Sequence, residues 1–241
     1  MALQALVFDV DGTLADTERD GHRPAFNAAF AEAGLDWHWD VHLYGTLLAV
    51  TGGKERIRHF CERYDPDFLA RPDADDAVEA LHEDKTRRYV AAAAAGKVRL
   101  RPGVASLIEE ARATGVRLAI ATTTRPENVA VLLEAELGPD ALGWFEVVGA
   151  GDVVPRKKPA PDIYAWVVER LHLRPQDCLA IEDSAVGLCA ALAAGLPTVV
   201  TQSPYTRGER TVGALAVLPD LAATTLSKLA DLHQAATGPT H

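Results

Sequence analysis

The feature that most constrains the fold is a short apolar run near the start of the chain, which ends in acidic residues. The run covers residues 5–8 and is followed by Asp9, Asp11 and Gly12. An apolar run of this length, bounded by a turn signal, is typical of a strand buried on both faces in the centre of a parallel sheet. Because residues two apart in a strand point the same way, we expect Asp9 and Asp11 to share one side at its carboxyl end.

Two neighbouring carboxylates at a buried strand end need a compensating charge. They repel each other, and burial makes this repulsion costly unless a cation or a proton offsets it. A divalent metal ion with oxygen ligands is the simplest solution. Gly12 would then allow the sharp exit from the strand, and Thr13 offers a hydroxyl and an amide to an anion. A strand followed by an ordinary acidic turn stays open as the alternative, since Asp-Gly alone is common in turns.

The composition excludes several classes of protein. The 241 residues carry a net charge of -10, with 48% hydrophobic and 24% charged residues, as in folded globular domains. The negative charge argues against nucleic acid or anionic membranes as partners. Three scattered cysteines without CxxC spacing argue against a disulfide framework or a zinc site. No apolar run approaches the roughly 18 residues of a membrane span, and no signal peptide is expected. We therefore expect a cytoplasmic protein, and, as a separate expectation, a monomer.

The helix and strand patterns divide the chain into two parts. A helix is predicted over 24–33, and the residues from Trp37 to about Ala95 carry only helical patterns. This indicates an all-helical insertion over 17–95. In the remaining residues, 1–16 and 96–241, helices alternate with short apolar strands. Beyond the first strand, the predicted strands are 116–121, 145–148, 178–181 and 197–200.

This alternation predicts an α/β core in which helices cover both faces of a doubly wound parallel sheet. In such sheets ligands bind beyond the carboxyl ends of the strands. The polar residues that end or follow the strands are therefore expected to converge on one site, which would contain Asp9, Asp11, Thr122, Thr123, Thr124, Lys158, Glu182 and Asp183.

The residue types in this set suit phosphoryl transfer. Carboxylates from two strands can hold Mg²⁺ and leave positions for water and a substrate phosphate. The threonines can donate hydrogen bonds to phosphate oxygens, and Lys158 adds a positive charge. Phosphoryl transfer needs little more than positioning and charge neutralisation. Each piece also has a plainer interpretation: the threonines, or Glu182 with Asp183, can cap helices, and Lys158 can be a surface charge. No GxxxxGK[ST] sequence is present, so a nucleotide-binding P-loop is not supported.

Four motifs resemble the haloacid dehalogenase superfamily, in its phosphatase and phosphomutase branch. They are DVDGT at 9–13, ATTT at 121–124, KKPAPD at 157–162 and IEDS at 181–184. The resemblance implies a Rossmann-like core with a helical cap inserted after the first motif. It also implies that Asp9 is the nucleophile that forms an aspartyl phosphate and that Asp11 is the general acid and base.

The same resemblance implies the remaining site. Mg²⁺ would be held by Asp9, the main-chain carbonyl of Asp11 and Asp183, with Glu182 nearby or directly bound. Thr122 and Lys158 would bind the phosphate. The cap would select the substrate, and its candidates are Glu18, His22, Arg23, Tyr44, Gly52, Gly53, Lys54, Arg56, Arg58 and His59. The glycines before a basic helix turn at 51–59 can accommodate a second phosphate, although a solvated basic helix face is the alternative.

Longer segments resemble the CbbY proteins of carbon-fixation operons. These are DTERDGHRPAFNAAFAEAGL, TGGKERI and PYTRGERTVGA. That resemblance implies hydrolysis of xylulose-1,5-bisphosphate, an inhibitory by-product of Rubisco, so the expected partner is a small sugar bisphosphate. A phosphomutase similar to β-phosphoglucomutase, a phosphoglycolate phosphatase and a non-catalytic metabolite sensor stay open as alternatives. Intact Asp9, Asp11 and Lys158 argue against the sensor, which needs no nucleophile.

Overall fold

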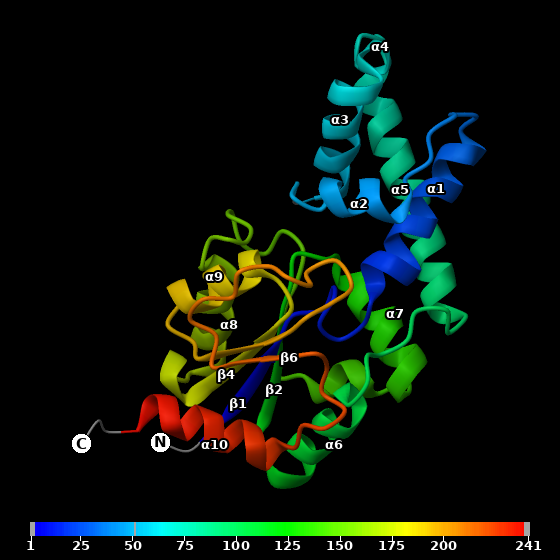
Figure 1. The fold of residues 1–241 in the computed structure, drawn as a ribbon. Coiled ribbons are helices and arrows are strands. Elements are labelled where there is room, and N and C mark those ends of the chain that lie inside the picture. Colours follow the sequence, from blue (N-terminus) through cyan, green and yellow to red (C-terminus); the bar gives the residue numbers. More distant parts are fainter. Residues whose placement is uncertain (1–2, 51, 239–241) are drawn as a thin grey trace. The chain divides into compact units, whose positions relative to one another are not determined.

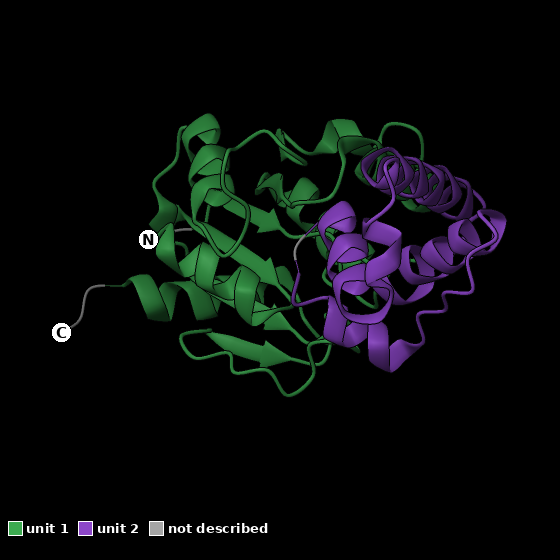
Figure 2. Cartoon of the chain, turned by 90° about the horizontal axis from the view of Figure 1, so that it is seen from above, with its two compact units in different colours: residues 1–17, 98–241 green, residues 18–97 purple. Residues whose placement is uncertain are grey.

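The structure, a computed structural model, describes residues 3–50 and 52–238, and its fold is shown in Figure 1. The chain separates into two compact units, which Figure 2 shows in different colours. The first, called the core unit, comprises residues 1–17 and 98–241. The second, called the helical unit, comprises residues 18–97, where the sequence predicts an insertion over 17–95.

A six-stranded parallel sheet forms the centre of the core unit, which confirms the predicted α/β class. The strand order is β3-β2-β1-β4-β5-β6, the order of a Rossmann-type doubly wound sheet. In this arrangement β1 lies between β2 and β4, with Phe8 opposite both Ile120 and Ile181. The strands are β1 (Ala5–Phe8), β2 (Arg117–Ala121), β3 (Val147–Gly149), β4 (Cys178–Glu182), β5 (Thr198–Thr201) and β6 (Ala216–Leu218).

Helices cover both faces of this sheet (Figure 1). Helix α8 packs on β2 and β3, α9 packs on β4 and β5, and α6 contacts β2 and α10. The residues of β1 are fully buried, as expected for a central strand, and Ala5 and Val7 share one core cluster with the apolar residues of α8. The helices are α6 (Val104–Thr114), α7 (Pro126–Leu137), α8 (Asp162–Leu171), α9 (Ala185–Ala193) and α10 (Leu226–Thr237), with short 3-10 turns η2 (Ala141–Trp144) and η3 (Pro175–Asp177).

The described part of the helical unit consists of helices around an aromatic core. The ring of Trp39 lies 4.7 Å from that of Phe26 and 4.8 Å from that of Phe30, and Trp37 lies 5.3 Å from Phe60. These centroid distances are typical of favourable aromatic pairs. The unit contains the π-turn η1 (Glu18–His22) and α1 (Arg23–Glu32), α2 (Val41–Leu47), α3 (Gly53–Tyr64), α4 (Pro66–Leu69) and α5 (Ala74–Ala94).

The two chain segments that border the insertion meet within the core unit. Ala15 forms an antiparallel bridge with Leu100, and the amide of Arg101 donates a hydrogen bond of 2.8 Å to the carbonyl of Leu14. The chain thus leaves and re-enters the core unit at neighbouring positions. None of the helices described for residues 3–50 and 52–238 is long and apolar enough to cross a membrane.

Candidate active site

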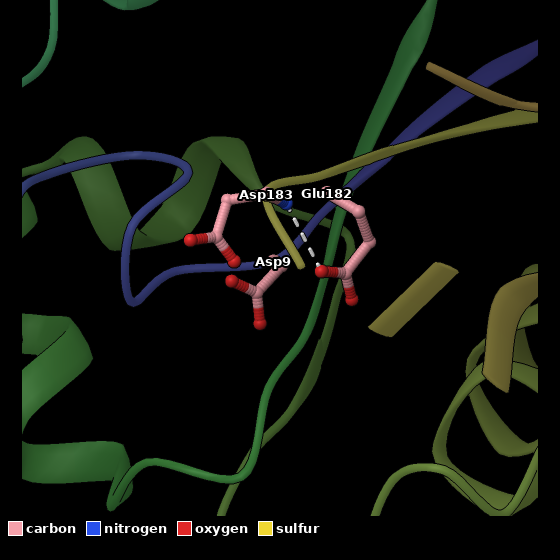
Figure 3. Close-up of side chains that lie close together, drawn as sticks. All are labelled: Asp9, Glu182 and Asp183. Atoms are coloured by element: carbon pink, nitrogen blue, oxygen red, sulfur yellow. Dashed lines mark hydrogen bonds between the residues drawn. The ribbon is translucent and has the colours of Figure 1, made fainter. Parts of the chain in front are cut away.

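Three carboxylates meet at the carboxyl ends of β1 and β4 (Figure 3). Asp9 follows β1 directly, Glu182 is the last residue of β4, and Asp183 comes next. Because β1 and β4 are adjacent and parallel, their ends coincide, and the amide of Asp9 donates to the carbonyl of Ile181 at 3.0 Å. One ligand atom from each carboxylate lies within 4.8 Å of the others, and all three residues are buried. This geometry suits a shared cation.

Lys158 supplies one positive charge to this cluster. Its Nζ lies 2.7 Å from Asp9 Oδ1 and 2.6 Å from Glu182 Oε1, and the residue is 7% exposed. Burial alone would lower the pKa of this amine, but the two carboxylates raise it above its ordinary value. Lys158 is therefore a permanent cation bridging β1 and β4, not the surface charge of the plainer interpretation.

The charges on the three carboxylates are only partly offset. Burial, together with the neighbouring carboxylates of Glu182 and Asp11, raises the pKa of Asp9 to about 7 against the opposing effect of Lys158. Burial also raises the pKa of Asp183 well above its usual range. One ammonium against three carboxylates leaves an excess of negative charge, which a bound divalent cation would neutralise. The residues present therefore fit a metal ion.

The turn after β1 has room for the third carboxylate only because residue 12 is glycine. A Cβ on Gly12 would lie 2.1 Å from Asp183 Oδ2, and its φ of +89° is in the left-handed region. Asp11, on the same turn, accepts a hydrogen bond of 2.6 Å from Thr17 Oγ1. The hydroxyl of Thr13 is buried and has no hydrogen-bond partner among the described residues. Such a buried polar group is costly unless a ligand pairs with it.

The threonines after β2 lie at the same edge of the sheet. The amide of Thr122 donates to the carbonyl of Gly149 at 2.9 Å, and Thr122 Oγ1 accepts a bond of 3.2 Å from the amide of Thr124. Thr122 and Thr124 are buried and Thr123 is half-buried. The N-cap of α7 is Arg125, so these threonines do not occupy the cap position.

Helix α9 also has a cap outside the predicted site. Ser184 accepts a hydrogen bond of 3.1 Å from the amide of Gly187, so neither Glu182 nor Asp183 serves as the N-cap. The carboxylates are thus left for the site, where Glu182 Oε2 accepts a bond of 3.2 Å from the amide of Asp183.

The structure adds residues that the sequence analysis does not assign to the site. Tyr164 donates a hydrogen bond of 2.6 Å to Glu182 Oε1. Thr206 donates one of 3.3 Å to Asp183 Oδ2, and its own hydroxyl accepts from the amide of Ser203 at 2.9 Å. Thr206 lies in the PYTRGERTVGA segment. Thr206 lies outside the four short motifs. Tyr164 lies two positions after the last residue of KKPAPD, and this closeness is the one signal in the sequence that could have pointed to it.

Arg101 is a further buried residue next to this site. Its guanidinium donates to the carbonyls of Gly12, Thr201, Gln202 and Pro219 and lies 3.4 Å from Asp16 Oδ1. It therefore joins the turn after β1 to the segments that follow β5 and β6.

Five of the candidates in the helical unit fall into two groups. Glu18, Tyr44 and Arg56 lie together: Tyr44 donates to Glu18 Oε2, and the Arg56 guanidinium donates to Tyr44 Oη at 3.0 Å. By contrast, Lys54 and Arg58 form exposed ion pairs, at 2.5 Å with Glu79 and at 2.7 Å with Asp75.

The remaining candidates of the helical unit have individual surroundings. The ring of His22 lies 4.1 Å from that of Tyr89, and a Cβ on Gly53 would lie 2.5 Å from the ring of His82. Gly52, with a φ of +102°, is the N-cap of α3. Arg23 begins α1 and is half-buried, and His59 Nδ1 lies 3.7 Å from Glu62.

The fold and the acidic site together define a hydrolase class. Residues 3–195 match the family of haloacid dehalogenase-like hydrolases, and the chain belongs to this family. Over 219 residues it is 53% identical to the plasmid-encoded CbbY protein of Cupriavidus necator, covering 91% of this chain and 86% of that protein.

Two solved structures of CbbY from Rhodobacter sphaeroides are similar to the chain throughout. One was determined with phosphate, and it is 45% identical with a TM-score of 0.85. The other is a variant with an Asp-to-Asn substitution in complex with xylulose-1,5-bisphosphate, also 45% identical, with a TM-score of 0.86. Each match covers 95% of this chain and 99% of the CbbY chain.

Proposed function

We propose that the protein is a Mg²⁺-dependent phosphatase that removes one phosphate from xylulose-1,5-bisphosphate through an aspartyl-phosphate intermediate. The observation that carries the proposal is the contact of Lys158 with both Asp9 and Glu182 beside Asp183. This arrangement occurs in a chain that is 45% identical, over 95% of its length, to a CbbY protein solved with that sugar bisphosphate.

In the first step, Asp9 attacks the phosphorus atom. A bond forms between the Asp9 carboxylate and phosphorus, and the bond from phosphorus to the sugar oxygen breaks. The attacking carboxylate must be ionised, which the ammonium of Lys158 at 2.7 Å favours. Lys158 also holds positive charge next to the transferring phosphoryl group.

We propose that Asp11 acts as the general acid in the first step and as the general base in the second. It donates a proton to the departing sugar oxygen, and then takes one from the water that attacks the aspartyl phosphate. That second step regenerates Asp9 and releases inorganic phosphate. The hydrogen bond of 2.6 Å from Thr17 fixes the orientation of the Asp11 carboxylate for this role.

The other core residues hold the phosphate and the metal. Four threonines would donate hydrogen bonds to the phosphate oxygens: Thr13, Thr122, Thr123 and Thr124. The buried hydroxyl of Thr13, which has no hydrogen-bond partner among the described residues, supports this role. Mg²⁺ would be held by Asp9, Asp183, the main-chain carbonyl of Asp11 and Glu182. When bound, it supplies positive charge that stabilises the phosphoryl group in the transition state.

The helical unit is proposed to select the sugar. Glu18, Tyr44 and Arg56 combine a carboxylate, a phenol and a guanidinium in one hydrogen-bonded cluster, which suits sugar hydroxyls and phosphate. The other proposed substrate contacts are His22, Arg23, Gly52, Gly53, Lys54 and Arg58. We also propose that the protein acts in the cytoplasm as a monomer.

A panel of sugar phosphates tests the proposed function. The purified protein is incubated with Mg²⁺ and, separately, xylulose-1,5-bisphosphate, ribulose-1,5-bisphosphate, glucose-1-phosphate and phosphoglycolate, and the released phosphate is measured. We expect the highest kcat/KM for xylulose-1,5-bisphosphate and loss of activity when the cation is chelated. Comparable rates on all substrates would contradict the assigned substrate.

Other outcomes of the panel distinguish the alternatives. Conversion of glucose-1-phosphate to glucose-6-phosphate without net phosphate release would identify a phosphomutase. Preference for phosphoglycolate would identify a phosphatase of that acid. Binding of a sugar phosphate with no turnover of any substrate would identify a sensor.

A further inference from the structure

Tyr164 is a fully buried residue of α8 whose hydroxyl lies within the acidic site. The hydroxyl donates a hydrogen bond of 2.6 Å to Glu182 Oε1 and lies 3.4 Å from Lys158 Nζ. The ring also packs against the same ammonium, with Nζ 5.0 Å from the ring centroid. Tyr164 therefore contacts both members of the Lys158–Glu182 ion pair.

The Glu182 carboxylate is fixed by donors on both of its oxygens. Oε1 accepts from Tyr164 and from Lys158, each at 2.6 Å, and Oε2 accepts from the amide of Asp183 at 3.2 Å. Glu182 itself is 1% exposed. A buried carboxylate held by three donors has one defined orientation, and that orientation directs Oε1 at Lys158.

Lys158 depends on this orientation for its own position. Its ammonium is shared between Asp9 and Glu182, which come from neighbouring strands. If Glu182 rotated about its side-chain bonds, the ammonium would follow it or lose one of its two carboxylate partners. The proposed contact of Lys158 with the transferring phosphoryl group would then be lost for part of the time.

We propose that Tyr164 is a positioning residue that holds Glu182 against Lys158 and thereby keeps Lys158 on Asp9. This inference rests on the proposed function, in which Asp9 and Lys158 act on the phosphoryl group. Tyr164 touches no reacting atom of the substrate and acts through Glu182 and Lys158. Its effect is therefore expected in the chemical step and not in substrate affinity.

The test compares Tyr164→Phe with the wild-type protein. Phenylalanine keeps the ring and removes only the hydroxyl, so the packing of α8 is retained. Tyr64→Phe, at a side chain that is 52% exposed, is the matched control. Steady-state kcat and KM are measured on xylulose-1,5-bisphosphate at saturating Mg²⁺. Removing a residue that hydrogen-bonds to a metal-site side chain and orients it typically lowers activity by about 10- to 100-fold. We expect this loss in kcat, with KM changed by less than about threefold.

A second measurement reports on Lys158 without turnover. The rate of acetylation of each lysine is followed by mass spectrometry, with the neighbouring, half-buried Lys157 as the internal reference. In the wild-type protein Lys158 is 7% exposed and held by two carboxylates, so it should label slowly. We expect Tyr164→Phe to increase its labelling several-fold relative to Lys157, and Tyr64→Phe to leave it unchanged.

Two results would overturn the inference. One is a kcat within about twofold of wild type together with unchanged labelling of Lys158, which would make Tyr164 an ordinary core tyrosine. The other is a rise in KM at constant kcat, which would place its effect on substrate binding. If the wild-type protein hydrolyses no sugar phosphate, the proposed function fails. The labelling experiment is independent of turnover, so unchanged labelling of Lys158 in Tyr164→Phe would still rule out Tyr164 as a positioning residue.

Discussion

The Glu182 carboxylate occupies the space that a side chain at Gly187 would need. A Cβ placed on Gly187 would lie 2.0 Å from Oε2 and 2.1 Å from Oε1 of Glu182. Gly187 is in the first turns of α9, where glycine is otherwise a poor helix former. Glycine at position 187 therefore lowers the stability of α9, but it leaves the space in which the Glu182 carboxylate reaches Lys158.

Gly187→Ala should weaken the site although alanine favours helices. The propensity gain is about 1 kcal/mol, but the collision with a buried carboxylate should cost about 1–3 kcal/mol and displace the partner of Lys158. We expect kcat to fall by about tenfold or more, measured by phosphate release. Gly143→Ala is the control, because a Cβ at Gly143 would meet no atom within 4 Å. Full activity of Gly187→Ala would show that the position of Glu182 does not matter.

Asp9→Asn should abolish turnover while the fold survives. An amide cannot form the aspartyl phosphate, so we expect a loss on the order of 10⁴-fold or more. Circular dichroism should be unchanged, because the substitution removes one of three clustered negative charges. Asp152→Asn, at an exposed residue, is the control. Activity close to wild type in Asp9→Asn would place the nucleophile at another residue.

The stability of the cation-free protein should fall as pH rises from about 4 to about 7. Asp9 releases its proton near its ordinary pKa of 3.8 when unfolded but only near about 7 when folded. Between these values the folded state binds more protons, so this group lowers the unfolding free energy by up to about 1.4 kcal/mol per pH unit. The raised pKa of Asp183 acts in the same direction.

Mg²⁺ should reverse this loss at high pH. A cation at 100 times its Kd stabilises by about 2.7 kcal/mol, and it binds the ionised form of Asp9, which predominates above pH 7. Urea unfolding at pH 5 and pH 8, with chelator or with Mg²⁺, measures both effects. We expect a large Mg²⁺ effect only at pH 8, and a shallower pH dependence in Asp9→Asn. Equal Mg²⁺ effects at both pH values would place the cation elsewhere.

Lys54→Ala should raise KM for a bisphosphate more than for a monophosphate. A charged hydrogen bond contributes about 1.5–3 kcal/mol, so loss of a phosphate contact should raise KM roughly tenfold or more. Lys54 must exchange Glu79 for the phosphate, and breaking this exposed pair should cost little stability. Arg71→Ala, which removes another exposed pair, is the control. Equal changes in KM for both substrates would remove Lys54 from the second phosphate site.

The sheet and the acidic cluster follow from local sequence patterns. The central strands are apolar runs because they are buried on both faces, and β1 and β4 end where polar residues begin. A parallel sheet then brings Asp9 and Asp183 together without further information. The edge strand β6 is not predicted although residues 214–218 are all apolar, because it is short and is not buried on both faces as the central strands are. It has three residues, and Val217 in its middle is 45% exposed.

Contacts between distant segments leave no such pattern. Arg101 reads in the sequence only as a basic residue before Pro102, yet its guanidinium binds carbonyls of Gly12 and Pro219, which are 89 and 118 positions away. Similarly, Thr206 reaches Asp183 from a loop after β5. Main-chain carbonyls are the same in every residue, so the sequence cannot show which of them a buried guanidinium will find.

The bridge between Ala15 and Leu100 allows the inserted segment to change during evolution without disturbing the sheet. Because the core unit closes on itself at this bridge, the length and sequence of what lies between the two residues are not constrained by the sheet. Insertions, deletions or wholesale exchange of residues 18–97 would leave the proposed phosphoryl-transfer residues at the ends of β1 and β4 in register. Under the proposed function, in which the helical unit selects the sugar, exchange of this one contiguous piece of sequence would give the same chemistry a new substrate.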